Sequence, residues 1–341
     1  MLYPMIFAPR FVEKMWGGRK LASVLNKPIP PEKPIGESWE LFDFPPGVVE
    51  DSKEWISAVL TNGPLAGQTL HQLVGRFGRD LHGDVPLVGE HGQFPILIKF
   101  LDAREDLSVQ VHPPQSYADT HPGAHLKNEA WYAVQSDPGA RILKGLVPGT
   151  TQATFEQSIK DGTCEQQLGS IPVKLDDCHY LPSGTVHALG AGCLVAEVQT
   201  PSDTTYRVFD FNRIDPSTGS PRTLHVQQAL DCIDFTTPQP PPMRRRHEAG
   251  FFTTVTRLVQ APQFMIEKVR MSEGVAQKIP YSQPVVWIML QGEVSIAVKG
   301  AADATTVGRG TTVLLPANMA DPVVTAGSDA AWLEVTFPDQ L

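Results

Sequence analysis

The stretch from Leu107 to Pro113 combines side chains that can bind a metal with strict alternation of polar and apolar residues. In a β-strand, alternate side chains point to the same face. Ser108, Gln110 and His112 therefore share one face, and the apolar side chains between them share the other. Alternation alone favours an edge strand with its polar face in water. If the polar face pointed inward instead, it would line an interior with metal-binding groups.

Two further stretches carry metal-binding side chains. Lys127 and Glu129 are two residues apart, so a strand would place them on one face. In isolation, a surface ion pair is the simplest interpretation of that spacing. His187 follows a Pro-Ser-Gly turn and begins an apolar segment. A single histidine of this kind is usually a polar group with ordinary hydrogen bonds.

Taken together, these side chains form a chemically coherent set. They supply one amide oxygen, two imidazoles and one carboxylate, from Gln110, His112, Glu129 and His187. Imidazole with carboxylate suits zinc, and four-coordinate zinc enzymes keep a position for water or substrate. The amide is a less common ligand and would be diagnostic of a particular kind of site.

Polar residues also gather between residues 194 and 213. Glu197 and Gln199 share one face of an expected strand, and Asp203 and Arg207 follow in a polar loop. An arginine near a metal suits an anionic or enediolate-like species. A salt bridge within the loop explains the same residues equally well.

The elements that must position these residues are mainly strands. Short runs with strand patterns dominate residues 94–200, and we expect a helical segment at about 52–82 from its apolar spacing. The proline- and arginine-rich segment 238–247 is expected to be an extended linker. Residues 248–341 are then a second run of strands, in which Leu315-Pro316-Ala317 echoes Leu181-Pro182-Ser183.

The charge balance limits the partners. The formal net charge is −9, so the surface as a whole repels nucleic acid and anionic membranes. An anionic small molecule would need a local cluster of Lys and Arg. The four cysteines form no C-x-x-C pair and are expected to be reduced thiols in a cytoplasmic protein. We expect no leader peptide and no membrane-spanning segment.

At the level of motifs, the chain resembles the type I mannose-6-phosphate isomerases, particularly the short bacterial form. The matching motifs occur in order along the first two-thirds of the chain: Trp16-Gly17-Gly18, Gly36 to Glu40, Asn62 to Leu65, Leu107 to Pro113, Lys127 to Tyr132, Pro182 to Leu189, and Glu197 to Arg207. The last third matches weakly.

The resemblance implies a mainly β fold of two cupin-type β-barrels, with a short helical segment on the first. It implies a catalytic domain over 1–237 and a second, metal-free cupin-like domain over 248–341. It also implies one zinc ion per chain, held by Gln110, His112, Glu129 and His187. Ser108, Lys99, Lys127 and Arg207 would bind the substrate, and Arg207, Lys99, Lys127, Glu197 and Asp203 would take part in catalysis.

The reaction implied is the interconversion of mannose 6-phosphate and fructose 6-phosphate through an enediol or enediolate. Lys99 is the first candidate for the base, provided that burial and neighbouring cations lower its pKa. Glu197 and Asp203 are its rivals. A metal-dependent cupin oxygenase and a non-catalytic sugar-binding cupin are the alternative functions. The expected oligomeric state is a monomer or a weak homo-oligomer.

Overall fold

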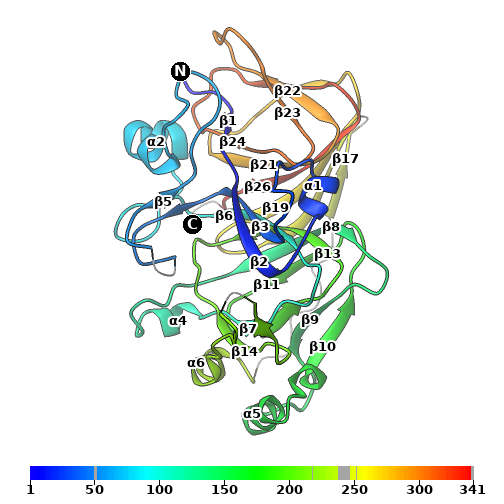
Figure 1. Ribbon diagram of the computed structural model, residues 1–341. Coiled ribbons are helices and arrows are strands. Elements are labelled where there is room, and N and C mark those ends of the chain that lie inside the picture. The colour runs from blue at the N-terminus through cyan, green and yellow to red at the C-terminus, as the bar shows by residue number, and fades with distance from the viewer. Residues whose placement is uncertain (50–51, 217, 237–245, 251, 339–341) are drawn as a thin grey trace.

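The computed structural model of the chain describes residues 1–49, 52–216, 218–236, 246–250 and 252–338. Antiparallel strands form most of it, which confirms the predicted mainly β class. The strands build two pairs of large sheets, which we call the N-terminal and the C-terminal sandwich (Figure 1). No helix in the described residues is long and apolar enough to cross a membrane.

The N-terminal sandwich consists of a six-stranded and a five-stranded sheet. The six-stranded sheet has the order β11 (Cys178–Leu181), β8 (Glu129–Ser136), β13 (Cys193–Gln199), β6 (Leu97–Asp102), β3 (Ile35–Leu41) and β2 (Arg10–Gly18). The five-stranded sheet has the order β10 (Leu168–Pro172), β9 (Arg141–Leu146), β12 (His187–Leu189), β7 (Val109–Val111) and β14 (Tyr206–Phe209).

The C-terminal sandwich pairs a seven-stranded with a four-stranded sheet. The larger sheet runs β1 (Met5–Ile6), β24 (Thr312–Leu315), β21 (Val285–Gln291), β26 (Ala330–Thr336), β19 (Met265–Met271), β18 (Thr253–Gln260) and β17 (Arg246–Ala249). The smaller runs β20 (Ala276–Lys278), β25 (Val323–Ala326), β22 (Glu293–Ala297) and β23 (Thr305–Gly308).

Short helices and two small hairpins complete the described part of the fold. The helices are α1 (Lys20–Ser23), α2 (Leu70–Phe77), α3 (Arg79–His82), α4 (Gln115–Ala118), α5 (Gln152–Lys160), α6 (Val226–Cys232) and a 3-10 turn, Cys164–Gln167. The hairpin strands are β4 (Asp43–Phe44) with β5 (Ile56–Ser57), and β15 (Ile214–Asp215) with β16 (Ser220–Pro221). The sequence did not predict α5.

Each sheet of the N-terminal sandwich buries both faces. Side chains such as Trp131 and Ile142 fill the space between its two sheets. The outer face of the five-stranded sheet is covered by α5 and α6, which Figure 1 shows at the end of the molecule opposite the C-terminal strands. The outer face of the six-stranded sheet packs against the C-terminal sandwich in one shared core that includes Phe100 and Ile288.

The prediction of a helical segment over 52–82 is correct only near its end. The described residues from 52 to 69 contain β5 and turns, because Ile56 and Ser57 pair with Phe44 and Asp43. The helix α2 begins only after Thr69, whose side chain accepts from the backbone N–H of Gln72 in a capping box. Pairing with a distant strand has overridden the local apolar spacing.

The predicted division into two domains stays a prediction, and strand pairing bears on its boundaries. Residues 238–245 of the predicted linker lie outside the described residues, but Arg246 and His247 already belong to β17 and pair with β18. At the other end, Met5 and Ile6 pair with β24 of the C-terminal sandwich. The first residues of the chain therefore belong to the second sandwich. The description of both halves as closed cupin-type barrels stays a prediction.

The two sandwiches repeat the same strand register. Glu197 lies opposite Trp131 in the first, and Glu334 lies opposite Trp287 in the second. Leu181 pairs with Glu129, whereas Leu315 pairs with Val285. The echo of Leu-Pro-Ser in Leu-Pro-Ala thus falls at equivalent strand ends, and an apolar valine stands where the first sandwich has Glu129.

Candidate metal centre

Three strand ends bring the predicted ligands together inside the N-terminal sandwich. His112 follows β7 directly, Glu129 begins β8 and His187 begins β12. Their side chains are almost fully buried, and the three ligand atoms lie within 4.8 Å of one another. His187 Nε2 is 3.0 Å from Glu129 Oε1, and His112 Nε2 is 3.4 Å from Glu129 Oε2. This spacing suits a single cation between the three groups.

Alternation alone favoured an edge strand for residues 107–112, and that interpretation is wrong. The strand β7 lies inside its sheet, between β12 and β14. Val109 and Val111 point outward to the core beneath α5 and α6, so Ser108, Gln110 and His112 face the interior. The polar face of the strand lines the site.

Both histidines are oriented by backbone carbonyl groups. His112 Nδ1 lies 3.0 Å from the Thr204 carbonyl oxygen, and His187 Nδ1 lies 2.8 Å from that of Thr185. Each carbonyl can accept a hydrogen bond from Nδ1–H, which leaves Nε2 as the ring nitrogen directed toward Glu129. Burial lowers the pKa of His112 to about 3, which keeps the ring in the neutral form that ligands require.

Glu129 is a buried carboxylate with unused acceptor capacity. Neither oxygen has a hydrogen bond of good geometry among the described residues. Burial raises its pKa, but Lys127 and His112 outweigh burial and hold the pKa well below its ordinary value. A bound divalent cation would satisfy both oxygens, so the residues present fit a metal.

Gln110 lies beside this cluster, with its side-chain amide nitrogen 3.4 Å from His187 Nε2. Rotation of the amide by 180° exchanges its nitrogen and oxygen. The oxygen then points at the same atoms as the two histidines. The structure thus brings all four predicted side chains together, and their role as ligands stays a prediction.

The lysines of the site are paired with carboxylates. Lys127 Nζ lies 3.0 Å from Glu129 Oε2, and Lys99 Nζ lies 3.5 Å from Glu37 Oε2 and 3.8 Å from Glu197 Oε1. Burial lowers the pKa of Lys99, but Glu37 and Glu197 outweigh it and raise the pKa above its ordinary value. The expected lowering of this pKa is therefore wrong, because the neighbours of Lys99 are anions, and Lys99 is not suited to be the base.

Glu197 faces the interior opposite Lys99 and Trp131. Its Oε2 accepts a hydrogen bond of 2.8 Å from Trp131 Nε1, whereas Oε1 has no hydrogen-bond partner among the described residues. Burial and the charge of Glu129 raise the pKa of this carboxyl. A fixed carboxylate with one free oxygen is well placed to exchange a proton.

Arg207 and Ser108 form the opposite wall. Arg207 pairs with Gln110 across the sheet and donates from Nε to Ser108 Oγ at 3.2 Å and from Nη1 to the Thr223 carbonyl. Asp203, in the half-buried loop before β14, is close enough to Lys99 to contribute to its raised pKa. All ten predicted site positions therefore belong to one region of the sandwich.

The sequence assigned no role to Glu37 and Trp39, although both belong to a quoted motif. Trp39 Nε1 donates to Glu37 Oε2 at 2.7 Å, and the Lys99 ammonium lies 4.9 Å from the centre of the Trp39 ring. Lys14 is a second cation beside Glu37, at 3.1 Å. Alternation of the two residues in one expected strand was the signal that could have grouped them with Lys99.

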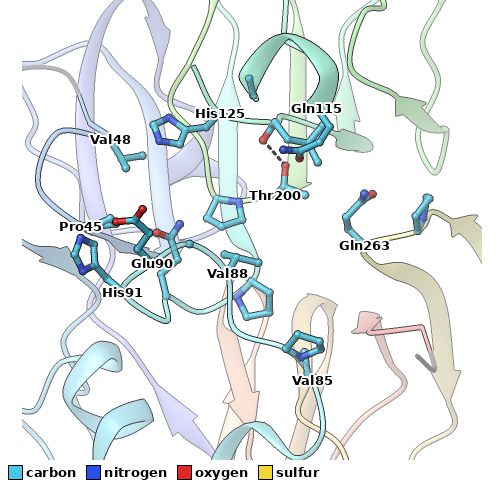
Figure 2. Close-up of a pocket in the computed structure, with 18 of the residues that line it drawn as sticks. Pro45, Val48, Val85, Val88, Glu90, His91, Gln115, His125, Thr200 and Gln263 are labelled. Atoms are coloured by element: carbon cyan, nitrogen blue, oxygen red, sulfur yellow. Dashed lines mark hydrogen bonds between the residues drawn. The ribbon is translucent and has the colours of Figure 1, made fainter. Parts of the chain in front are cut away.

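A cavity of about 620 Å³ is lined in part by His125 and Leu126, which precede Lys127 in the chain. None of the four predicted metal ligands lines it. Figure 2 shows Gln115, His125, Thr200 and Gln263 around it, with prolines and valines on the other walls. None of its lining residues is Lys or Arg, so its charge does not suit a phosphate group. The chemistry of the molecule is better placed at the histidine and glutamate cluster.

Antiparallel sheets that enclose a buried His–Glu–His cluster define a β-sandwich protein with a candidate metal centre. The family described as phosphomannose isomerase type I, catalytic domain, matches residues 5–141. The mannose-6-phosphate isomerase of Streptococcus mutans is 35% identical over 302 residues, which are 88% of this chain and 89% of that protein. The chain belongs to the type I phosphomannose isomerase family, as the motifs predicted.

Further similarities agree with this assignment. The mannose-6-phosphate isomerase ManA of Bacillus subtilis is 35% identical over 277 residues, covering 81% of this chain and 82% of that protein. The crystal structure of a mannose 6-phosphate isomerase from Bacillus subtilis has a TM-score of 0.85 at 28% identity, with 98% of this chain and 100% of that chain covered. The fold of the family thus extends over both sandwiches.

Proposed function

We propose that the protein is a zinc-dependent aldose–ketose isomerase that interconverts mannose 6-phosphate and fructose 6-phosphate. The convergence of His112, Glu129 and His187 in the interior is the observation that carries the proposal. Relatives that cover 88% and 98% of this chain bear the name mannose-6-phosphate isomerase, which supports the choice of substrate.

One zinc ion would be held by Gln110, His112, Glu129 and His187. Two imidazoles with a carboxylate suit zinc, and an amide as fourth protein ligand leaves less room for the open positions that iron oxygenases need. When bound, the metal supplies a Lewis acid that polarises the carbonyl and hydroxyl oxygens of the sugar. The unsatisfied oxygens of Glu129 support this assignment.

Glu197 is the residue best suited to move the proton. The aldose loses the proton on C2 to a base, and the resulting enediol or enediolate receives a proton on C1 to give the ketose. The free Oε1 of Glu197 can accept and return that proton while Trp131 holds Oε2. Rather than acting as the base itself, Lys99 lies 3.8 Å from Glu197 Oε1, and its positive charge counteracts the rise that burial and Glu129 cause in the pKa of Glu197.

The remaining predicted residues orient the substrate. Arg207, positioned by Ser108, would stabilise the developing oxyanion. Lys127 would donate hydrogen bonds to substrate hydroxyl groups from its place beside Glu129. Asp203 would hold Lys99 in position through its charge.

The catalytic role belongs to the N-terminal sandwich in this proposal, and the C-terminal sandwich has no metal. The four cysteines are free thiols, which supports a reducing compartment such as the cytoplasm. We expect a monomer or weak homo-oligomer that binds no nucleic acid and no membrane.

The proposal is tested with the purified full-length chain and mannose 6-phosphate. Fructose 6-phosphate should appear in a coupled assay, and elemental analysis should find about one zinc per chain. Removal of the metal by a chelator should abolish turnover, and added zinc should restore it.

Glu293→Gln in the same assay is the matched control for Glu129→Gln, because Glu293 is exposed on the C-terminal sandwich. Glu129→Gln should lose both zinc and turnover, and the control should keep both. Absence of fructose 6-phosphate from a zinc-loaded sample would refute the proposed reaction. Iron in place of zinc would point to oxygen chemistry instead.

A further inference from the structure

A row of four side chains crosses the five-stranded sheet at the level of the metal centre. Lys144 of β9 pairs with His187 of β12, His187 pairs with Gln110 of β7, and Gln110 pairs with Arg207 of β14. Residues opposite one another on neighbouring strands project to the same face of a sheet. Two predicted metal ligands thus lie between a lysine and an arginine.

The packing of neighbouring residues on β9 also indicates that Lys144 faces the interior. Ile142 packs inside the sandwich with Leu189 and Trp131, whereas Leu143 packs outside with Phe155 of α5. Lys144 lies two residues after Ile142 and therefore shares its face. Its α-carbon is the direct cross-strand partner of His187, so its side chain begins one strand away from the metal centre.

The charge of Lys144 is not neutralised by a carboxylate. Within the described parts of the chain, its ammonium forms neither an ion pair nor a side-chain hydrogen bond, although the residue is half-buried. Lys99 and Lys127 of the same interior are each paired with glutamates at 3.0–3.8 Å. An unpaired cation is rarely left half-buried unless it meets an anion.

We propose that Lys144 is a further substrate-binding residue, whose ammonium contacts the phosphate group of the sugar phosphate. This inference rests on the proposed function. A phosphate monoester carries a charge of about −1.5 to −2 at neutral pH. In a chain of net charge −9, it needs a cation that is not already neutralised within the site.

The row is also long enough for its two end residues to contact opposite ends of a sugar phosphate. Neighbouring strands are roughly 4.8 Å apart, so β9 and β14 are separated by about 14 Å. Arg207 lies at one end of the row, where it would stabilise the oxyanion at C1 and C2 of the sugar. Lys144 lies at the other end, beyond the metal ligands, where it would contact the phosphate group. Phosphate recognition at Lys144 and oxyanion stabilisation at Arg207 then use different cations.

The test compares Lys144→Met with Lys144→Arg in the zinc-loaded, full-length protein. Calorimetric titration with mannose 6-phosphate and with unphosphorylated mannose separates recognition of the phosphate from recognition of the sugar. Loss of one charge-assisted contact should weaken binding of the sugar phosphate by about tenfold to a hundredfold in Lys144→Met. Binding of mannose should not change, and Lys144→Arg should recover most of the loss.

Lys299→Met is the matched control, because it removes the same charge from an exposed lysine of the C-terminal sandwich. It should bind both sugars as the wild type does. Equal affinities of wild type and Lys144→Met for mannose 6-phosphate would overturn the inference. An equal loss of affinity for mannose 6-phosphate and for mannose in Lys144→Met would also overturn it. The titration measures affinity rather than rate. A protein that isomerises mannose 6-phosphate normally and binds it equally well with and without the Lys144 side chain therefore refutes this inference alone.

Discussion

At the scale of single residues, Glu197 and Glu334 occupy equivalent positions in the two sandwiches but differ in their neighbours. The neighbours suit Glu197 to catalysis and Glu334 to a structural role. Glu334 has both oxygens occupied, by Trp287 Nε1 at 2.8 Å and by the hydroxyl of Tyr281. Glu197 has one oxygen that accepts a hydrogen bond from Trp131 and one that accepts no hydrogen bond among the described residues. Lys99 lies opposite Glu197, whereas Glu267 lies opposite Glu334. Only the first carboxylate has an oxygen that accepts no hydrogen bond among the described residues and can therefore exchange a proton.

We therefore expect Glu197→Gln to lower kcat by roughly a hundredfold or more, the usual contribution of a general base. The zinc content should stay at the wild-type value, because Glu197 is not among the predicted ligands. Steady-state kinetics and elemental analysis of the same preparation measure both. Glu334→Gln is the matched control and should keep kcat; a large loss in the control, or none in Glu197→Gln, would contradict the assignment.

At the scale of elements, the family motifs outside the site hold strands together. The backbone of Gly17 on β2 approaches β3 so closely that a Cβ would lie 2.5 Å from Gly36 N and 2.6 Å from the carbonyl carbon of Ile35. Asn62 fastens the start of the chain, since its side chain accepts from the N–H of Ile6 and donates to the Pro4 carbonyl. The first motif fixes β3, which carries Glu37 and Trp39, and the second fixes β1.

Gly17→Ala should lower the free energy of unfolding by about 1–3 kcal/mol, the usual cost when overpacking forces the backbone to shift. The backbone atoms that oppose the new methyl group cannot rotate away. Urea unfolding followed by tryptophan fluorescence measures the change in the free energy of unfolding.

Gly75→Ala provides the comparison for that experiment. A Cβ at Gly75 in α2 meets nothing within 4 Å, so the substitution should stabilise the protein by about 0.5–1 kcal/mol. If both variants shifted stability in the same direction, the close approach at Gly17 would not be the cause.

At the scale of the whole molecule, the two sandwiches are not independent. Buried residues of both contribute to one core, in which Leu41 and Phe100 of the first meet Ile288 and Leu333 of the second. The first strand, β1, completes the sheet of the second sandwich. Asn128, which lies between Lys127 and Glu129, also donates to Gln263 Oε1 at 3.0 Å. The second sandwich thus supports the strand that carries Glu129.

The N-terminal fragment 1–236 should therefore not fold alone. Removal of the C-terminal sandwich would expose a large apolar face, which favours aggregation. The full-length chain should unfold in one calorimetric transition, because the shared core couples the two halves. A soluble fragment with bound zinc, or two separate transitions in the full chain, would show that the halves are autonomous.

The amino-acid sequence by itself determined the types of the candidate ligands, the alternation that puts Gln110 and His112 on one face, the mainly β class and the family. These features are local, because strand periodicity and short motifs are written in consecutive residues. Only the tertiary structure decided which way that face points, since β7 lies between β12 and β14 rather than at an edge. It also decided the charge state of Lys99, whose partner Glu37 is distant along the chain. Long-range strand pairing sets both, and no local pattern specifies which strands pair.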